Sequence, residues 1–140
     1  MTIVLDTSGL LAAVDADQRF HPAAREALER SRTDLVLSPF VLAELDYMVL
    51  TRVGRAQELS LLDEVAKGAY RLDPFSAKDV AEAGKLIREY SDLDIGLADA
   101  SNVVLADRHE TLDILTLDEW HFRPLRSGSG RPFRLLPFDA

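Results

Sequence analysis

Cysteine is absent from the 140-residue sequence, which excludes a disulfide framework, a cysteine-ligated zinc site and a thiol nucleophile. No apolar run approaches the roughly 18 residues that a membrane-spanning helix needs. The first residues also lack the basic segment and cleavage site of a secretory signal. The sequence therefore predicts a single domain over residues 1–140 that is located in the cytoplasm and has no membrane segment.

Basic residues are scarce, since 16 Lys and Arg against 24 Asp and Glu give a net charge of −8. Binding to a nucleic-acid backbone depends largely on neutralising phosphates, so this balance argues against a broad nucleic-acid surface. The charge is uneven, because residues 119–140 hold four arginines against two acidic residues. A polyanionic ligand would have to be met locally, by this C-terminal segment or by bound cations.

Apolar runs suited to buried strands alternate with helical patterns along the chain. We expect strands at residues 3–5, 35–37, 70–72, 114–115 and 133–136. We expect helices at residues 8–14, 22–31, 39–53, 55–67, 76–90 and 96–107, with a short helical turn at 118–121. The apolar spacing predicts that Leu59 and Val80 face inward. This alternation indicates an α/β fold with helices around a central, mostly parallel sheet.

Four acidic residues differ from the others in their surroundings. Two follow directly on a predicted strand, and two lie on predicted helices without a basic neighbour at helical spacing. Asp6 and Asp118 each come after an apolar strand, where open α/β sheets bind ligands. Glu44 and Asp99 lie on predicted helices without a local cation, and Glu44 projects from what should be a buried stripe. Burying unpaired carboxylates costs several kcal/mol, so their convergence would demand a cation. Hard oxygen ligands select Mg²⁺ or Mn²⁺.

Neighbouring polar residues are expected to support these acids by hydrogen bonds, and they are Thr7, Ser8, Asn102 and Thr116. A divalent cation at such a site can clamp a phosphodiester and activate water. Each acid also has a simpler explanation. Asp6 and Asp118 could be helix caps, Glu44 could pair with a distant arginine, and Asp99 could be favoured by the helix dipole.

The order and spacing of these motifs resemble the PIN-domain family, and specifically VapC toxins of bacterial toxin–antitoxin pairs. The resemblance covers essentially the whole chain. It rests on Val4-Leu5-Asp6-Thr7-Ser8, Leu42-Ala43-Glu44-Leu45, Gly96-Leu97-Ala98-Asp99-Ala100-Ser101, Leu115-Thr116-Leu117-Asp118-Glu119-Trp120-His121-Phe122 and Arg131-Pro132-Phe133-Arg134-Leu135-Leu136-Pro137.

This resemblance implies a three-layer α/β/α PIN-like domain that acts as a metal-dependent endoribonuclease. Asp6, Glu44, Asp99 and Asp118 match the acids with which the family holds Mg²⁺ or Mn²⁺. VapC-like proteins cut structured RNA, often tRNA or ribosomal RNA, and thereby stop translation. They form homodimers, are neutralised by a cognate VapB antitoxin, and contact operator DNA only through that antitoxin.

Candidate RNA-contacting residues are Arg52, Arg55, Arg123 and Arg126. They could equally form a solvated or antitoxin-binding surface. Trp120 stands where the family often has a basic or small residue, so we expect it to change substrate or antitoxin contacts. The three histidines, His21, His109 and His121, are expected to lie at the surface or in hydrogen bonds and not to bind metal.

Two other functions fit the acids without this family. One is a magnesium-dependent phosphohydrolase with Asp6 as covalent nucleophile, although the sequence lacks the second Asp two residues further on that such enzymes typically use. The other is a non-catalytic binding module in which the four acids are structural.

Overall fold

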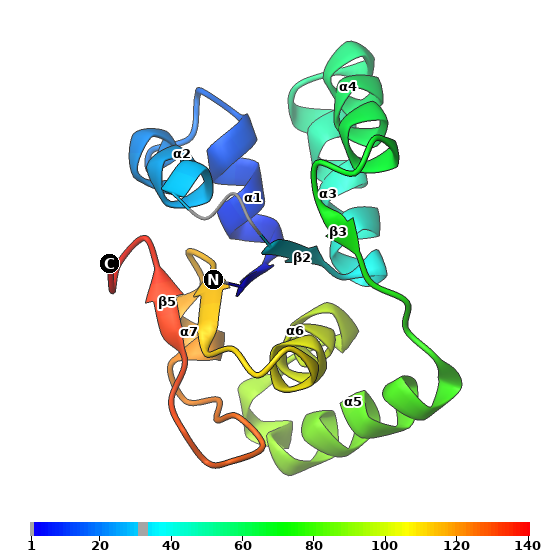
Figure 1. The fold of residues 1–140 in the computed structure, drawn as a ribbon, viewed down its shortest axis with the longest axis vertical. Helices are drawn as coiled ribbons and strands as arrows, with labels where there is room; N and C mark the ends of the chain where they lie inside the picture. Colours follow the sequence, from blue (N-terminus) through cyan, green and yellow to red (C-terminus); the bar gives the residue numbers. More distant parts are fainter. Residues whose placement is uncertain (1, 31–33) are drawn as a thin grey trace.

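The computed structural model describes residues 2–30 and 34–140, and a parallel five-stranded sheet lies at its centre (Figure 1). The strand order is β3-β2-β1-β4-β5, and every pairing is parallel. The strands are β1 (Thr2–Leu5), β2 (Asp34–Leu37), β3 (Arg71–Leu72), β4 (Asp113–Leu115) and β5 (Arg134–Leu136). All five predicted strands are therefore confirmed.

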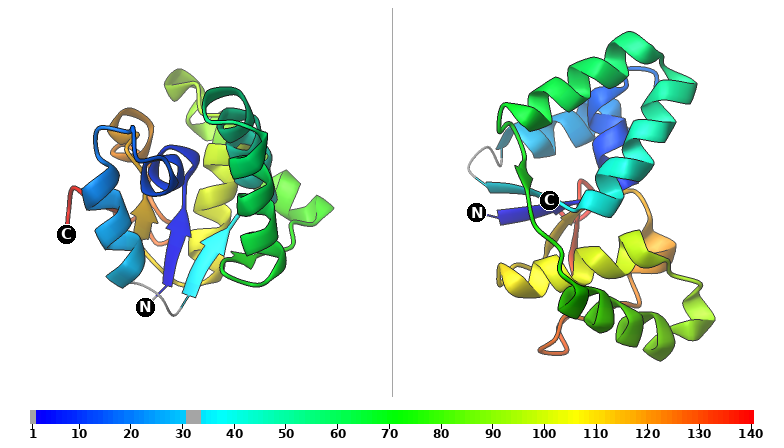
Figure 2. Two further views of the ribbon diagram at one scale, coloured as in Figure 1. Left: turned by 90° about the horizontal axis from the view of Figure 1, so that it is seen from above. Right: turned by 90° about the vertical axis from the view of Figure 1, so that its right-hand side faces the viewer.

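Helices cover both faces of the sheet and make three layers. They are α1 (Thr7–Val14), α2 (His21–Arg30), α3 (Pro39–Arg52), α4 (Arg55–Ala66), α5 (Ala77–Glu89), the 3-10 turn η1 (Ser91–Leu93), α6 (Leu97–Arg108) and α7 (Glu119–Phe122). Helices α1 to α4 lie on one side and α5 and α6 on the other (Figures 1 and 2). The α/β/α architecture is confirmed, while Ser31, the predicted end of the second helix, lies outside the described residues.

Strand residues alternate between two apolar cores because successive side chains point to opposite faces of the sheet. Ile3 and Leu5 pack with residues of α1 to α4. Val4 and Val36 pack with residues of α5, α6 and α7. This double burial explains why the strands read as continuous apolar runs in the sequence. None of the helices in residues 2–30 and 34–140 is long and apolar enough to cross a membrane.

The chain reverses its direction of winding between β1 and β4. It runs outward from β1 through β2 to β3, and then returns to add β4 and β5 on the other side of β1. The carboxyl ends of β1 and β4 are joined by a hydrogen bond of 2.9 Å from the Asp6 N–H to the Leu115 carbonyl. Ligands of open α/β sheets bind at such a switch point, so this edge is where a site is expected.

Helix α1 approaches this edge closely because Gly9 has no side chain. A Cβ atom placed on Gly9 would lie 2.8 Å from the Thr116 nitrogen and closer still to the Leu115 carbonyl. Both are backbone atoms of the sheet edge and cannot swing aside. Gly9 therefore sets the distance between α1 and the carboxyl end of β4.

The prediction that Leu59 and Val80 face inward is wrong. Leu59 is 57% exposed and Val80 is 44% exposed, whereas Leu61 and Ala83 are buried. The reason is that α4 packs mainly on α3 and α5 mainly on α6, with the sheet beyond. A helix that covers another helix buries a narrower stripe than one lying on a sheet, and a sequence pattern does not reveal which of the two it covers.

A pair of carboxyl groups links α3 and α4. The side chain of Glu58 is buried, and Oδ1 of Asp46 is also buried and has no hydrogen-bond partner among the described residues. Contact with Asp46 and burial raise the pKa of Glu58, and they outweigh Arg55, whose guanidinium lies 2.6 Å from Glu58. Burial and the neighbouring carboxyl group of Asp46 thus make the negative charge on Glu58 less favourable.

We predict that Gly9→Ala destabilises the protein by about 1–3 kcal/mol, because the new methyl group overlaps backbone atoms. The matched control is Gly84→Ala in α5, where a Cβ meets nothing within 4 Å and helix propensity should give a gain of up to about 1 kcal/mol. Urea unfolding of both variants measures the difference. Equal stability of the two variants would contradict the close approach.

We predict that Glu58→Gln raises the melting temperature at pH 8 and leaves it nearly unchanged near pH 4. A raised carboxyl pKa favours folding below the unfolded value, and this contribution is lost as the pH rises through the folded value. Thermal unfolding across this pH range measures the effect, with the exposed Glu64→Gln on the same helix as control. A lower melting temperature at pH 8 would show that the contact with Arg55 dominates.

Candidate active site

Asp6 lies buried at the switch point, and only 4% of its surface is exposed. It occupies the position before α1, but its side chain makes no capping bond, so the capping interpretation is wrong for this residue. Its carboxylate instead accepts hydrogen bonds from Asn102 (3.0 Å), Thr116 (2.7 Å) and Ser8 (3.2 Å). These donors come from α6, the end of β4 and α1, so three parts of the fold meet at one carboxylate.

The charge on Asp6 is nevertheless unfavourable in the isolated protein. Burial is the largest influence and raises the pKa of Asp6 to about 7, with a further contribution from the charge of Asp99. The hydrogen bonds from Thr116 and Ser8 act in the opposite direction and are outweighed. A carboxylate in this state is stabilised by any cation that reaches it.

Thr116 connects Asp6 to Asp118. Its hydroxyl donates to Asp6 and accepts the backbone N–H of Asp118 at 3.0 Å. The hydroxyl of Ser8 lies 3.2 Å away and accepts the Leu117 N–H at 2.9 Å. This network fixes the backbone that follows β4, and with it the start of α7.

Asp99 lies in the first turn of α6, where it accepts the Gly96 N–H at 3.3 Å. Burial is the first cause of its raised pKa. The charges of Asp118 and Glu44 raise it further, while His121 lowers it. The charge of Asp99 also acts on Asp6. Asp99 therefore interacts electrostatically with all three of the other predicted acids.

Glu44 is exposed, which corrects the expectation that it projects from a buried stripe. Val41 and Leu45 form the buried side of α3, and Glu44 lies beside that stripe at the rim of the site. Its carboxylate accepts a hydrogen bond of 2.7 Å from the hydroxyl of Thr7. The suggested ion pair with a distant arginine is absent from the described part of the chain.

Asp118 caps α7, so here the capping interpretation is confirmed. Its Oδ1 accepts the His121 N–H at 3.1 Å, and its Oδ2 lies 2.6 Å from Nδ1 of the His121 ring. The hydrogen bond to Asp118 is the main cause of the raised pKa of His121.

All three histidines are hydrogen-bonded as expected, through His21 to Ala12, His109 to Asp73 and His121 to Asp118.

Sequence reasoning missed the link between His121 and the site. The signal was the spacing of Asp118 and His121, which are three residues apart, because residues at this spacing face each other on a helical turn. All four predicted supporting residues hydrogen-bond to a predicted acid. Thr7 donates to Glu44. The other three donate to Asp6, and they are Ser8, Asn102 and Thr116.

The donor set fits a hard divalent cation by its chemistry. All four acids offer oxygen ligands, two of them have a raised pKa, and Oδ1 of Asn102 is buried without a partner in the described structure. Within residues 2–30 and 34–140, no three such side chains converge closely enough to form a finished metal site. The acids thus surround the site and are coupled by charge without meeting at one point.

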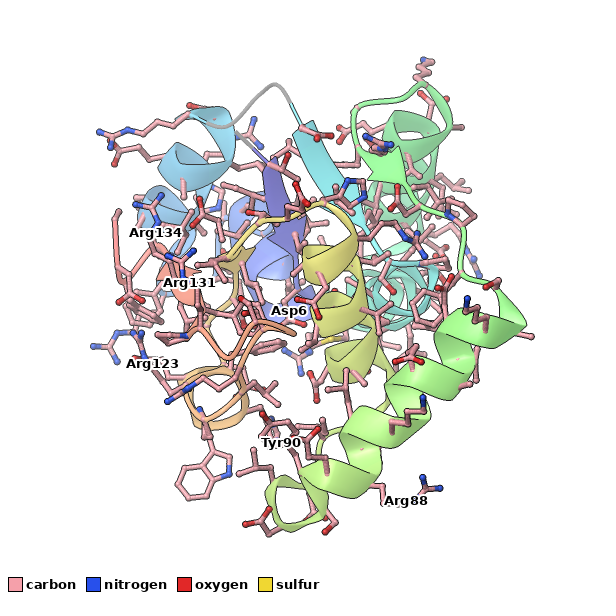
Figure 3. The ribbon with its side chains drawn as sticks, turned by 60° about the horizontal axis from the view of Figure 1, so that its bottom comes forward. Asp6, Arg88, Tyr90, Arg123, Arg131 and Arg134 are labelled. Carbon is pink, nitrogen blue, oxygen red and sulfur yellow. The ribbon has the colours of Figure 1, made fainter. Side chains whose placement is uncertain are left out.

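The candidate RNA-contacting arginines differ in whether other groups of the chain already bind their guanidinium groups. Arg55 bonds to Glu58, Arg123 bonds to Glu119 and Asp139, and Arg126 bonds to backbone carbonyls. Arg52 is exposed and has no ion-pair partner among the residues described. Figure 3 shows Asp6 centrally beside α6, with Arg123, Arg131 and Arg134 together on the side formed by the C-terminal segment.

Comparison with known proteins gives a consistent result. Residues 3–123 match the PIN domain family. Over 135 residues, the chain is 47% identical to ribonuclease VapC26 of Mycobacterium tuberculosis (strain ATCC 25618 / H37Rv), a match that covers 96% of this chain and 100% of that protein.

Two solved structures share the fold. The crystal structure of M. tuberculosis VapC20, a sarcin–ricin loop cleaving toxin, matches with a TM-score of 0.78 at 17% identity over 84% of this chain and 90% of that chain. DNA-bound VapBC from Salmonella typhimurium matches with a TM-score of 0.71 at 14% identity over 96% of this chain and 98% of that chain.

We predict that Asp6→Asn stabilises the metal-free protein at pH 8 by up to roughly 4 kcal/mol, the equivalent of a pKa raised from 3.8 to about 7. In the wild type, the contribution of Asp6 to stability is present below pH 3.8 and is lost as the pH rises through about 7. Thermal unfolding in EDTA at several pH values measures it, with the exposed Asp17→Asn as control. A destabilised Asp6→Asn protein would mean that the hydrogen bonds outweigh burial.

Proposed function

Because the chain belongs to the PIN domain family, we propose that it is a divalent-metal-dependent endoribonuclease and the toxin of a VapBC-type toxin–antitoxin pair. The 47% identity to a ribonuclease VapC over nearly the whole of both chains supports this assignment. The single structural observation that carries it is the buried carboxylate of Asp6, held by three donors at the switch point of the sheet and destabilised as a charge by burial and by Asp99.

Asp6, Glu44, Asp99 and Asp118 are the residues that would hold Mg²⁺ or Mn²⁺. When bound, such a cation would offset the repulsion among these carboxylates and stabilise negative charge on a phosphodiester. The protein supplies the rest. Asn102, Thr116 and Ser8 orient Asp6, and Thr7 orients Glu44.

The substrate that we propose is structured RNA, either tRNA or ribosomal RNA, whose cleavage inhibits translation in the cytoplasm. One structural relative is described as cleaving the sarcin–ricin loop. A net charge of −8 opposes RNA binding, so backbone contacts must be local. Arg52 is available for this, while Arg55, Arg123 and Arg126 would have to exchange their present partners for phosphates.

A VapB-like antitoxin is the proposed protein partner, and a homodimer is the proposed form of the toxin. Structural relatives include VapBC complexes bound to DNA, and DNA contact here would come only through the antitoxin. Tyr47 and Trp120 are 68% and 79% exposed. A partner that covered these side chains would remove apolar surface from water, which favours association.

We predict that the purified protein cuts total bacterial RNA into discrete fragments with Mg²⁺ or Mn²⁺, and that EDTA abolishes this. Asp6→Asn and Glu44→Gln should lower the rate about 100-fold or more, because a cation at this site contributes several kcal/mol of transition-state stabilisation. Gel analysis and end mapping of the fragments measure the activity.

The matched controls are Asp17→Asn and Glu64→Gln, which remove exposed charges outside the site and should leave the rate unchanged. Circular dichroism establishes that each variant is folded. Fragments that persist in EDTA, or a folded Asp6→Asn protein with full activity, would refute the proposed function.

A further inference from the structure

Asp118 is held differently from the other three acids. Both of its carboxylate oxygens bond to one residue, His121, through the backbone N–H at 3.1 Å and the ring Nδ1 at 2.6 Å. In the described part of the chain, no other group hydrogen-bonds to this carboxylate. The backbone contact is an ordinary helix cap, whereas the ring contact is an additional constraint on the side chain.

The remaining freedom of Asp118 is small. Its own N–H donates to Thr116, whose hydroxyl donates to Asp6. The backbone of Asp118 is thus tied to Asp6, and the rotation of its side chain is restrained by the backbone N–H and the ring of His121 together. A carboxylate has about four lone-pair sites, so two bonds from His121 leave oxygen lone pairs free for a cation.

We propose that His121 is a positioning residue, which holds the carboxylate of Asp118 in the orientation that completes the divalent-cation site. This inference rests on the proposed function for the identity of the site, and it adds a residue to it. The ring is partly buried, with 26% of its side chain exposed. Mutation of a residue that hydrogen-bonds to a metal-binding carboxylate typically lowers metal affinity or activity 10–100-fold.

The alternative is that His121 serves only to stabilise α7. The two roles differ in what a change of the ring does to cation binding. His121→Leu removes the ring contact and keeps the backbone cap. His121→Asn restores a side-chain N–H close to the place of Nδ1, so it is the matched control.

The test is calorimetric titration of Mn²⁺ into the wild type and both variants, together with thermal unfolding in EDTA. We expect His121→Leu to bind Mn²⁺ about tenfold more weakly and His121→Asn to recover most of the loss, with no parallel change in melting temperature. Unchanged or tighter Mn²⁺ binding by a folded His121→Leu protein would overturn the inference, as would a wild type that binds no Mn²⁺. If His121→Leu does not fold, His121→Ala takes its place, because it also removes the ring contact and keeps the backbone cap; a loss of about tenfold in Mn²⁺ affinity supports the inference, and unchanged affinity overturns it.

RNA cleavage is measured in parallel so that the two proposals can be separated. Weaker Mn²⁺ binding by His121→Leu, with no RNA cleavage by any protein including the wild type, would refute the ribonuclease function and leave the positioning role intact. Cleavage by the wild type with unchanged Mn²⁺ binding by His121→Leu would do the reverse.

Discussion

The buried carboxylate of Asp6 is the constraint on which the rest of the site depends. Three donors from separate parts of the chain converge on it, yet burial and the nearby Asp99 still raise its pKa to about 7. Hydrogen bonds alone therefore fail to make this charge favourable. A neutral group here would favour stability more than a charged one does, so the acid carries a stability cost that the proposed metal-binding function would account for.

Close contacts between elements fix the spacing of the four acids. Gly9 allows α1 to lie directly against the end of β4. Ser38, which caps α3, and Ser101 of α6 share a buried hydrogen bond of 2.7 Å. This bond ties the helix that carries Glu44 to the helix that carries Asp99. Side chains that repel each other are thus held by a rigid backbone, so their charges remain coupled when no cation is present.

Much of this was predictable from the sequence, and the failures have one cause. Strands buried on both faces are continuous apolar runs, and Asp6 and Asp118 follow two of them, so local pattern was sufficient there. The exposure of Leu59 and of Glu44 depends on which neighbour covers α4 and α3, and that is a tertiary property. The three-residue spacing of Asp118 and His121 is visible in the sequence, but its link to the candidate site depends on where Asp118 lies in the fold.

If the proposed function holds, the mutual repulsion of the acids has a thermodynamic consequence for RNA binding by this acidic protein. Without a cation, carboxylates coupled through Asp99 and a net charge of −8 both repel a phosphate backbone. A bound cation removes part of that repulsion, so cation and RNA must each strengthen the binding of the other by the same factor. Under the proposed function, the RNA affinity of the site would depend on the cation, and local neutralisation of charge would let a protein without a broad basic surface bind a polyanion.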